Sequence, residues 1–472
     1  MAYKELIEQV RKASYVGSIG AVLGWDQEVV MPKGSVDLRS HQLSVLSGIQ
    51  HGMFANKKVG MLIRKAKKES LAKDQQVNLK WIEYDYRRQI RVPNDLVSEF
   101  AKVSSHATEA WRQARKTNKF KLFEPHLQKI VALEKKRAMF INAKKQLYDV
   151  LLQGYDNALT SAQVASTFAV LKRRIPPLLR ERKKPKQISF SEEKQRKLNV
   201  MIAEKMGFNF RMGRLDVSTH PFTSGTMIDT RITTRYSQHP FESILALVHE
   251  TGHGLYEQGL PWKHFGTPLG ESVSMSMHES QSRIWENNVG RSEGFARWLA
   301  PKMGIGWKQI YDTVNYVHPS FIRVEADEVS YHMHIILRFE IERDLMNGKL
   351  SVKEIPQVWN EKMKEYLGIT PKTDALGCLQ DIHWTFGFGY FPTYSFGTMI
   401  AAQLFDAAKK RMPGLSQNIS KGNFMMLRNW LLKNIHEQGR RYDTNELTKR
   451  VTGEKPNPRA LLALFEAKHS KN

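Results

Sequence analysis

The residues best suited to chemistry lie in the stretch LVHETGHGLYEQG, residues 247–259. His249 and His253 are four positions apart, so on a helix they share one face and both imidazoles can reach one metal ion. Glu250 would lie about 100° around that helix, close to a metal-bound water but poorly placed to be a ligand. The pattern predicts a zinc hydrolase, because zinc lowers the pKa of its water from about 15.7 toward roughly 7 and a nearby carboxylate accepts the proton.

The residues that flank this motif predict a helix. Ser237 or His239 can begin it, Pro240 suits its first turn and Gly259 can end it. An H-E-x-x-H pattern arises by chance in roughly a few per cent of chains this rich in histidine, and the helical setting makes chance a weaker explanation. An apolar stripe would seat the helix against a core: Phe241, Ile244, Leu245 and Val248.

A catalytic zinc site also requires a third protein ligand and an open position. The stretch ESVSMSMHESQSRIWENN, residues 271–288, also reads as helical and follows His253 closely enough for a turn and a return helix. Glu279 is the best placed candidate among charged and polar neighbours, but spacing does not settle the choice. Four residues are eligible: Glu271, His278, Glu279 and Glu286.

The elements that must position these residues are mostly helical. Pro125 opens an amphipathic run, another helix follows KPNPRA near the C-terminus, and strand-like alternation is scarce outside Thr226–Ser237. We therefore predict a single, mostly α-helical catalytic domain over residues 1–472, with a small β-sheet beside the zinc helix. Ile175–Ser189, rich in proline and lysine, is predicted to be a surface loop, and composition does not decide whether it separates two domains.

The amino-acid composition is that of a basic globular protein. The 472 residues are 41% hydrophobic and 25% charged, which excludes wholesale disorder, and the formal net charge is +25 with a pI near 9.8. Such a charge attracts anionic partners, including nucleic acid, without reading sequence. The sequence has no zinc-finger cysteines and no RRM-type aromatic signature. We therefore interpret the charge as a solvated surface and keep nucleic acid or an acidic partner as the less favoured alternative.

Cysteine content and hydropathy indicate the compartment. Cys378 is the single cysteine, so an intrachain disulfide is excluded and a reducing environment is favoured. Its neighbours offer nothing to activate the thiol, so cysteine catalysis is not expected. The N-terminus lacks the apolar core of a signal peptide, and the apolar run Tyr15–Trp25 is too short to cross a bilayer. We expect a cytoplasmic protein with no membrane partner.

Seven motifs along nearly the whole chain resemble those of one family, the M32 metallocarboxypeptidases, also called thermostable or Taq-type carboxypeptidases. In chain order they are LGWDQEVVMP (23–32), HPF (220–222), DTRIT (229–233), HETGH (249–253), HESQ (278–281), IRVEAD (322–327) and GCLQDIHW (377–384). H-E-x-x-H alone is moderately specific, whereas this ordered set is very specific.

The resemblance implies a two-lobed, helical, gluzincin-like fold with a deep groove. It also implies a homodimer with one divalent metal per subunit, zinc foremost, with Co²⁺ able to substitute. Carried over by position, His249, His253 and Glu279 bind the metal and Glu250 is the general base. His278 would lie behind the ligands or on the substrate side. The pronounced basicity departs from the family.

A carboxypeptidase must also recognise a free C-terminal carboxylate, which an arginine can do through paired hydrogen bonds. Arg323 in IRVEAD is the candidate that the resemblance supports. The alternative is a structural salt bridge with Asp327, four residues on and on the same face if this segment is helical. Gln380 and Asp381 are expected to line or brace the groove.

Three further residues could stabilise the oxyanion of the tetrahedral intermediate. His383 could donate a hydrogen bond to it, or could instead be a packed histidine that orients a neighbour. Tyr394, and less favourably Tyr390, could serve through a phenol, although tyrosines in an apolar run are more often core residues.

The remaining candidates are assigned to substrate binding by the resemblance. Asp229 and Arg231 would restrict one end of the groove, with an ion pair at the sheet edge as the structural alternative. His220 is expected to shape the wall of the site, and Thr233 completes the same group.

Together these patterns predict a cytoplasmic, zinc-dependent carboxypeptidase that removes single C-terminal residues from peptides. An endopeptidase or dipeptidase with the same zinc helix is the nearest alternative. A basic protein that binds nucleic acid or an acidic partner, with zinc only as structure, is the alternative from another class.

Overall fold

The computed structural model describes residues 1–179 and 184–469. Helices dominate, and three short strands form one sheet, which confirms the predicted fold class. The chain divides into two compact units. Unit 1 contains Met1–Ile90, Pro185–Val314 and Ile400–Lys455; unit 2 contains Arg91–Lys184, Asn315–Met399 and Pro456–Asn472.

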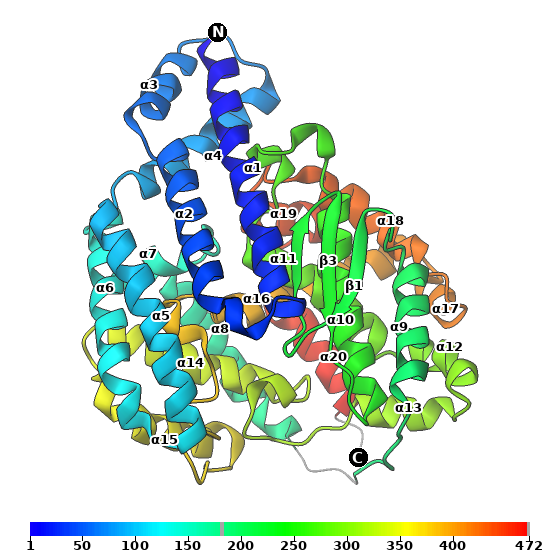
Figure 1. The fold of residues 1–472 in the computed structure, drawn as a ribbon. Helices are drawn as coiled ribbons and strands as arrows, with labels where there is room; N and C mark the ends of the chain where they lie inside the picture. Colours follow the sequence, from blue (N-terminus) through cyan, green and yellow to red (C-terminus); the bar gives the residue numbers. More distant parts are fainter. Residues whose placement is uncertain (180–183, 470–472) are drawn as a thin grey trace. The chain divides into compact units, whose positions relative to one another are not determined.

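Unit 1 is organised around helix α10 (Pro240–Gly259), which has the predicted start and end. Its buried face packs against helices α9 (Glu192–Met206) and α11 (Met275–Arg283) and against the sheet, as Figure 1 shows for α9, α10 and the strands. A seven-residue π-helix, Ile284–Gly290, continues α11. The other helices of unit 1 are α1 (Ala2–Val29), α2 (Val36–Phe54), α3 (Lys57–Ala66), α4 (Lys73–Gln89), α12 (Glu293–Met303), α13 (Trp307–Val314), α17 (Leu415–Ser420), α18 (Met425–Asn434) and α19 (Thr444–Thr452).

The sheet consists of β1 (Gly213–Val217), β2 (Thr223–Thr226) and β3 (Asp229–Thr234), in the order β1-β3-β2. The central strand β3 pairs in parallel with β1 and antiparallel with β2. It is the strand predicted within residues 226–237. Both β2 and β3 pack against α10, so the sheet lies beside the helix that carries the H-E-x-x-H motif, as the sequence predicts.

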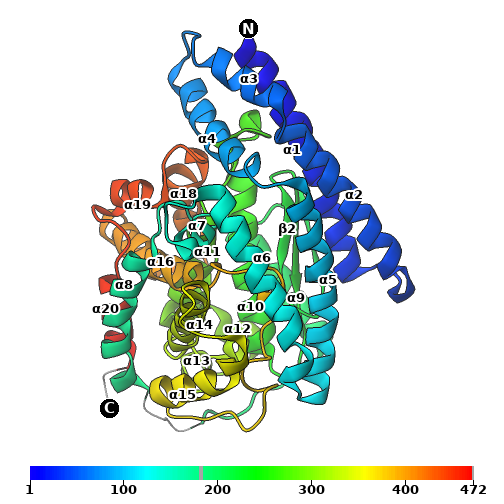
Figure 2. The ribbon, with the colours of Figure 1, turned by 90° about the vertical axis from the view of Figure 1, so that its left-hand side faces the viewer.

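Unit 2 is organised around helix α14 (Tyr331–Met346), most of whose residues are buried. It packs against α6 (Glu124–Asn142), α7 (Leu147–Leu152), α8 (Ser161–Arg174) and α15 (Ile355–Leu367). Figure 2 shows α5 and α6 running side by side along the same unit. The remaining helices are α5 (Asn94–Thr117), α20 (Arg459–His469) and the first part of α16 (Pro392–Arg411), which continues into unit 1.

The structure also bears on the predicted surface loop at residues 175–189 and on the question of a membrane-spanning helix. Of the predicted surface loop, residues 176–178 form a 3₁₀ turn and residues 184–189 have no regular secondary structure, while 180–183 lie outside the described residues. Among the described helices, none combines the length and the hydropathy that a bilayer-spanning segment requires.

Candidate metal centre and catalytic residues

Two histidines and one glutamate converge between α10 and α11. The Oε2 atom of Glu279 lies 3.7 Å from Nε2 of His249 and 3.4 Å from Nε2 of His253. The three potential ligand atoms all lie within 4.8 Å of one another. Two imidazole nitrogens and one carboxylate oxygen that face a common point fit the ligand set of a divalent cation such as zinc.

A glycine within the motif allows α11 to approach. A Cβ atom placed on Gly252 would lie 2.5 Å from the carbonyl oxygen of Gln281 and 2.7 Å from Cα of Ser282. Any larger residue would therefore push the backbone of α11 away from α10. Ser274 caps the start of α11 by accepting a hydrogen bond from the amide of Met277. Together these local features place Glu279 opposite the histidines.

The other eligible third ligands have different partners. Glu286, on the π-helix, contacts His249 from the opposite side of its ring, with Oε2 2.8 Å from Nδ1. This contact fixes the hydrogen on Nδ1 and leaves Nε2 free to coordinate a metal. Glu271 instead lies 3.5 Å from a guanidinium nitrogen of Arg440. Among the described residues, Glu279 is the carboxylate that completes the cluster.

Arg283, which the sequence reasoning missed, binds both carboxylates. Its Nε donates to Oε1 of Glu279 at 2.6 Å, and one terminal nitrogen donates to Glu286 at 3.1 Å. Burial alone would raise the pKa of Glu279, but Arg283 and the histidines hold it well below its ordinary value. Burial lowers the pKa of His249, but Glu279 and Glu286 outweigh it and raise that pKa, so a proton and a cation compete for this imidazole.

His278 lies behind the ligand His253. Its Nδ1 is 2.6 Å from Nδ1 of His253, and its Nε2 is 2.8 Å from Oε1 of Glu257 on α10. Burial lowers the pKa of His253 to about 3, so its ring is neutral at physiological pH, as a metal ligand must be. Of the two roles implied for His278, this geometry fits the position behind the ligands.

Glu250 is buried next to the sheet. Thr223 on β2 donates from its hydroxyl to Oε2 of Glu250 at 2.7 Å. Burial raises the pKa of Glu250 above its ordinary value, although His249 and Thr223 oppose the shift. The small sheet therefore has a clear role, because it supplies the hydrogen bond that orients this carboxylate.

Unit 2 holds the predicted substrate residues in a buried cluster of charges. Asp381 accepts from Nε of Arg323 at 3.0 Å and from Nε of Arg338 at 2.6 Å. Gln380 Oε1 accepts from the backbone amide of Arg323 and from a terminal nitrogen of Arg338. Burial alone would raise the pKa of Asp381, but Arg338 and Arg323 hold it well below its ordinary value. Two guanidinium groups thus share one carboxylate, and the cluster carries excess positive charge.

The structural alternative for Arg323, an ion pair with Asp327, is wrong. Asp327 does not continue a helix with Arg323, since a 3₁₀ turn covers only Arg323–Glu325. Asp327 instead accepts hydrogen bonds from the hydroxyl and amide of Ser330 and the amides of His318 and Val329. Arg323 pairs with Asp381, far along the chain, because the GCLQDIHW segment packs against the turn.

His383 and Tyr394 lie together. Nε2 of His383 is 3.2 Å from the hydroxyl of Tyr394, and the ring of Tyr390 packs 5.8 Å from the His383 ring. Burial, with Arg323, lowers the pKa of His383 to about 4, so the ring is neutral at physiological pH. Glu342 of α14 holds this segment from behind by accepting from Nε1 of Trp384 and the amide of Gly389, both at 3.0 Å.

The motif residues on and near the sheet make structural contacts. Asp229 and Arg231 form an ion pair at 2.9 Å, as in the structural alternative, and Arg231 also stacks on the buried ring of Trp25. Thr233 is fully buried, and its hydroxyl accepts from the amide of Phe222 at 2.8 Å, which ties the H-P-F segment to β3. His220 is exposed, and its carbonyl accepts from Ser218.

The residues that sequence reasoning missed are those that support the predicted ones: Thr223, Glu257, Arg283, Arg338 and Glu342. Arg283 follows Glu279 by one helical turn, and that spacing was a usable signal. Arg338 and Glu342 stand out as charges within a largely apolar stretch, HIILRFEIE (334–342), which predicts that they are buried with partners.

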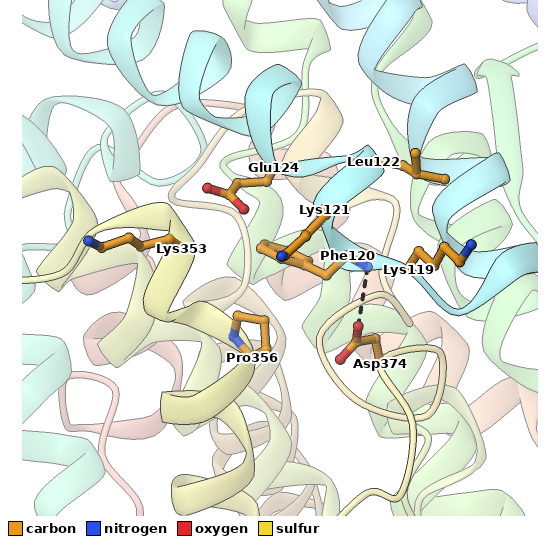
Figure 3. A pocket seen from close by; sticks show the side chains of 8 residues that line it. All are labelled: Lys119, Phe120, Lys121, Leu122, Glu124, Lys353, Pro356 and Asp374. Atoms are coloured by element: carbon orange, nitrogen blue, oxygen red, sulfur yellow. Dashed lines mark hydrogen bonds between the residues drawn. The ribbon is translucent and has the colours of Figure 1, made fainter.

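One surface hollow of about 410 Å³ lies elsewhere on unit 2 (Figure 3). The amide of Phe120 donates to Asp374 at 3.1 Å across its floor. None of the predicted catalytic or metal-binding residues lines it. Its lining residues are Lys119, Phe120, Lys121, Leu122, Glu124, Lys353, Pro356 and Asp374.

Comparison with known proteins identifies the family of this chain. Residues 5–469 match the family described as Carboxypeptidase Taq (M32) metallopeptidase. The chain is 37% identical to thermostable carboxypeptidase 1 of Thermus thermophilus, over 99% of this chain and 98% of that protein. It is 33% identical to carboxypeptidase 1 of Bacillus subtilis, again over 99% and 98%. A Pyrococcus furiosus carboxypeptidase structure, titled as Apo-Mg, superposes with a TM-score of 0.96 at 35% identity, covering 99% of both chains. The chain therefore belongs to the M32 carboxypeptidase Taq family of metallopeptidases and is a peptide hydrolase.

Proposed function

We propose that this protein is a zinc-dependent carboxypeptidase that removes single C-terminal amino acids from peptides, with Glu250 as the general base. The observation that carries the proposal is the convergence of His249, His253 and Glu279 beside the buried, oriented carboxylate of Glu250. A divalent cation held by these three side chains would supply Lewis acidity, lowering the pKa of water and polarising the scissile carbonyl.

The side chains of unit 1 then have distinct tasks. Glu250 accepts a proton from the attacking water and returns it to the leaving amine. Its raised pKa improves it as a base, and Thr223 keeps one of its oxygens in a fixed position. Glu286 keeps the His249 ring oriented, and Arg283 holds Glu279 ionised.

Exopeptidase specificity is supported by the charge of the Arg323 cluster. Arg323 and Arg338 bring two positive charges, and Asp381 supplies the negative charge that both contact. A buried excess of positive charge is costly unless an anion offsets it. The terminal carboxylate of a peptide is such an anion, so we assign its recognition to Arg323. The pair of His383 and Tyr394 is assigned to the oxyanion.

The metal and the base are tested together. The purified protein should hydrolyse peptides, lose activity on chelation and regain it with Zn²⁺ or Co²⁺. Glu250→Gln should bind metal as the parent does but lose hydrolysis by at least about a hundredfold. Thr251→Ser, which changes a buried neighbour on the same helix, is the matched control. Full activity in the chelated protein or in Glu250→Gln would overturn the proposal.

Exopeptidase action is tested with paired substrates. Mass spectrometry of one peptide as its free acid and as its C-terminal amide should show stepwise loss of single residues from the acid only. Equal cleavage of the amide would instead indicate the endopeptidase alternative.

We also propose that the protein is a cytoplasmic homodimer. Cys378 is buried and unpaired, which supports a reducing compartment. Helix α2 has no buried residue, and Leu38, Val45 and Ile49 lie exposed along one of its faces, which supports burial against a second copy. Analytical ultracentrifugation should show a dimer for the parent and a monomer for Val45→Asp. A parent that sediments as a monomer would contradict this.

A further inference from the structure

The arrangement behind the metal cluster carries a further inference, which rests on the proposed metal site. We propose that Glu257 and His278 act as positioning residues for His253, holding it in the tautomer whose Nε2 lone pair faces the metal. Glu257 follows His253 by one turn of α10, and His278 reaches between them from α11. The ring centroids of His253 and His278 are 4.6 Å apart.

The positions of the hydrogens follow from the contacts. Nε2 of His253 faces Glu279 Oε2 and must keep its lone pair to bind a cation, so the hydrogen of the neutral ring lies on Nδ1. Nδ1 of His253 is 2.6 Å from Nδ1 of His278, and one of these nitrogens must donate. His253 is therefore the donor and Nδ1 of His278 the acceptor.

The carboxylate of Glu257 sets this direction. With Nδ1 accepting, the hydrogen of a neutral His278 lies on Nε2, which is 2.8 Å from Oε1 of Glu257. An ionised carboxylate can only accept, so Glu257 selects this tautomer of His278. If the chain of hydrogen bonds ran the other way, the hydrogen of His253 would move to Nε2 and block the ligand atom.

The two histidine ligands are therefore supported differently. Nδ1 of His249 donates directly to the carboxylate of Glu286, whereas Nδ1 of His253 is linked to the carboxylate of Glu257 through the His278 ring. The side chains of His278 and Glu257 are 14% and 22% exposed, so this chain is largely shielded from water. Outer partners of this kind change metal affinity by 10- to 100-fold when they are removed.

The first test measures Zn²⁺ affinity by competition with a chromophoric chelator. His278→Leu removes the acceptor and should weaken binding about 10- to 100-fold. His278→Asn places an oxygen where Nδ1 lay and should recover much of this loss, although it cannot reach Glu257. Glu257→Gln should weaken binding in the parent but add little to His278→Asn, because the carboxylate acts only through the ring. Glu242→Gln, at an exposed site in the first turn of α10, is the matched control.

Two spectroscopic measurements complete the test. The visible spectrum of the Co²⁺-loaded protein should change in His278→Leu and return toward that of the parent in His278→Asn. Imidazole ¹⁵N NMR of the Zn²⁺-loaded parent, which does not depend on the folding of any variant, should show hydrogen on Nδ1 of His253 and Nε2 of His278. Hydrogen on Nδ1 of His278, or parental Zn²⁺ affinity in His278→Leu, would overturn the inference. A parent protein that binds no divalent metal would overturn the proposed function as well. A parent that is active and binds metal, with variants of unchanged Zn²⁺ affinity and Co²⁺ spectrum, would overturn this inference alone.

Discussion

Asp381 is the residue whose change should most affect unit 2, because two buried guanidinium groups share its carboxylate. The contacts from Arg323 and Arg338 are 3.0 Å and 2.6 Å long. Two unit charges about 3 Å apart attract by about 5 kcal/mol at an effective dielectric constant of about 20. Removing one partner of a buried pair leaves the other uncompensated and costs about 3–5 kcal/mol. We expect Asp381→Asn to reduce the free energy of opening unit 2 by this amount.

A second change should reverse most of the loss. Arg338 is fully buried and its guanidinium lies 4.5 Å from the centroid of the Trp359 ring, so a methionine can fill its place with apolar contacts. The double variant Asp381→Asn, Arg338→Met removes one anion and one cation and keeps the excess of one positive charge. It should therefore be more stable than Asp381→Asn, although it has lost more polar contacts.

Hydrogen exchange followed by mass spectrometry measures this opening locally. A loss of about 3–5 kcal/mol predicts roughly 10²- to 10⁴-fold lower protection for amides of α14, since each tenfold change is about 1.4 kcal/mol. Asp344→Asn, which breaks a half-exposed pair with Arg343 on the same helix, should change protection by no more than about 1 kcal/mol. Unchanged protection in Asp381→Asn, or a double variant no better than the single one, would refute the charge argument.

Three further predictions concern single side chains. Thr223→Val removes the hydrogen bond to Glu250 and should lower kcat/KM about 10- to 100-fold in a peptidase assay, with metal content unchanged; parental kinetics would contradict this. Burial raises the pKa of Glu134 to about 7 from an ordinary 4.5. The unfolded chain therefore releases this proton at a lower pH than the folded protein, and the free energy of unfolding should fall by about 3 kcal/mol as the pH rises from about 4.5 to 7. Below about pH 4.5 this residue should not change the free energy of unfolding. Glu134→Gln should abolish this part of the pH dependence, measured by guanidinium unfolding at pH 5 and pH 8. The same pH dependence in the parent and in Glu134→Gln would contradict the prediction. Lys468→Met removes the lysine that donates to buried Glu328 at 3.0 Å and should lower the unfolding free energy by about 3 kcal/mol, whereas an unchanged midpoint would show that the pair is dispensable.

The features that sequence predicted well depend on local signals. Helix α10 begins at Pro240 and ends at Gly259 because both residues act on their own turn of the chain. The spacing of His249 and His253 fixes their common face for the same reason. Strand β3 was recognisable from its β-branched alternation, which depends only on neighbouring residues.

The third ligand could not be chosen from spacing, because the choice depends on how closely two helices pack. Glu279 and Glu286 are two helical turns apart and both contact His249, one at Nε2 and the other at Nδ1. Spacing along the chain cannot distinguish the two sides of an imidazole ring. The close approach at Gly252 decides it, and that approach becomes visible only when the backbone of α11 is placed against α10.

The same limit explains why the structural alternative for Arg323, an ion pair with Asp327, was wrong, because that pair required a helix through both residues. The segment is a three-residue 3₁₀ turn, so the i, i+4 rule does not apply. The actual partner, Asp381, belongs to a distant motif and also binds Arg338. The IRVEAD motif viewed alone suggested one ion pair, whereas the fold joins Arg323 and Arg338 to one aspartate, Asp381. The excess charge to which we assign recognition of the terminal carboxylate is therefore a property of the packing, and changing Arg338 should alter peptide affinity even though no motif contains it.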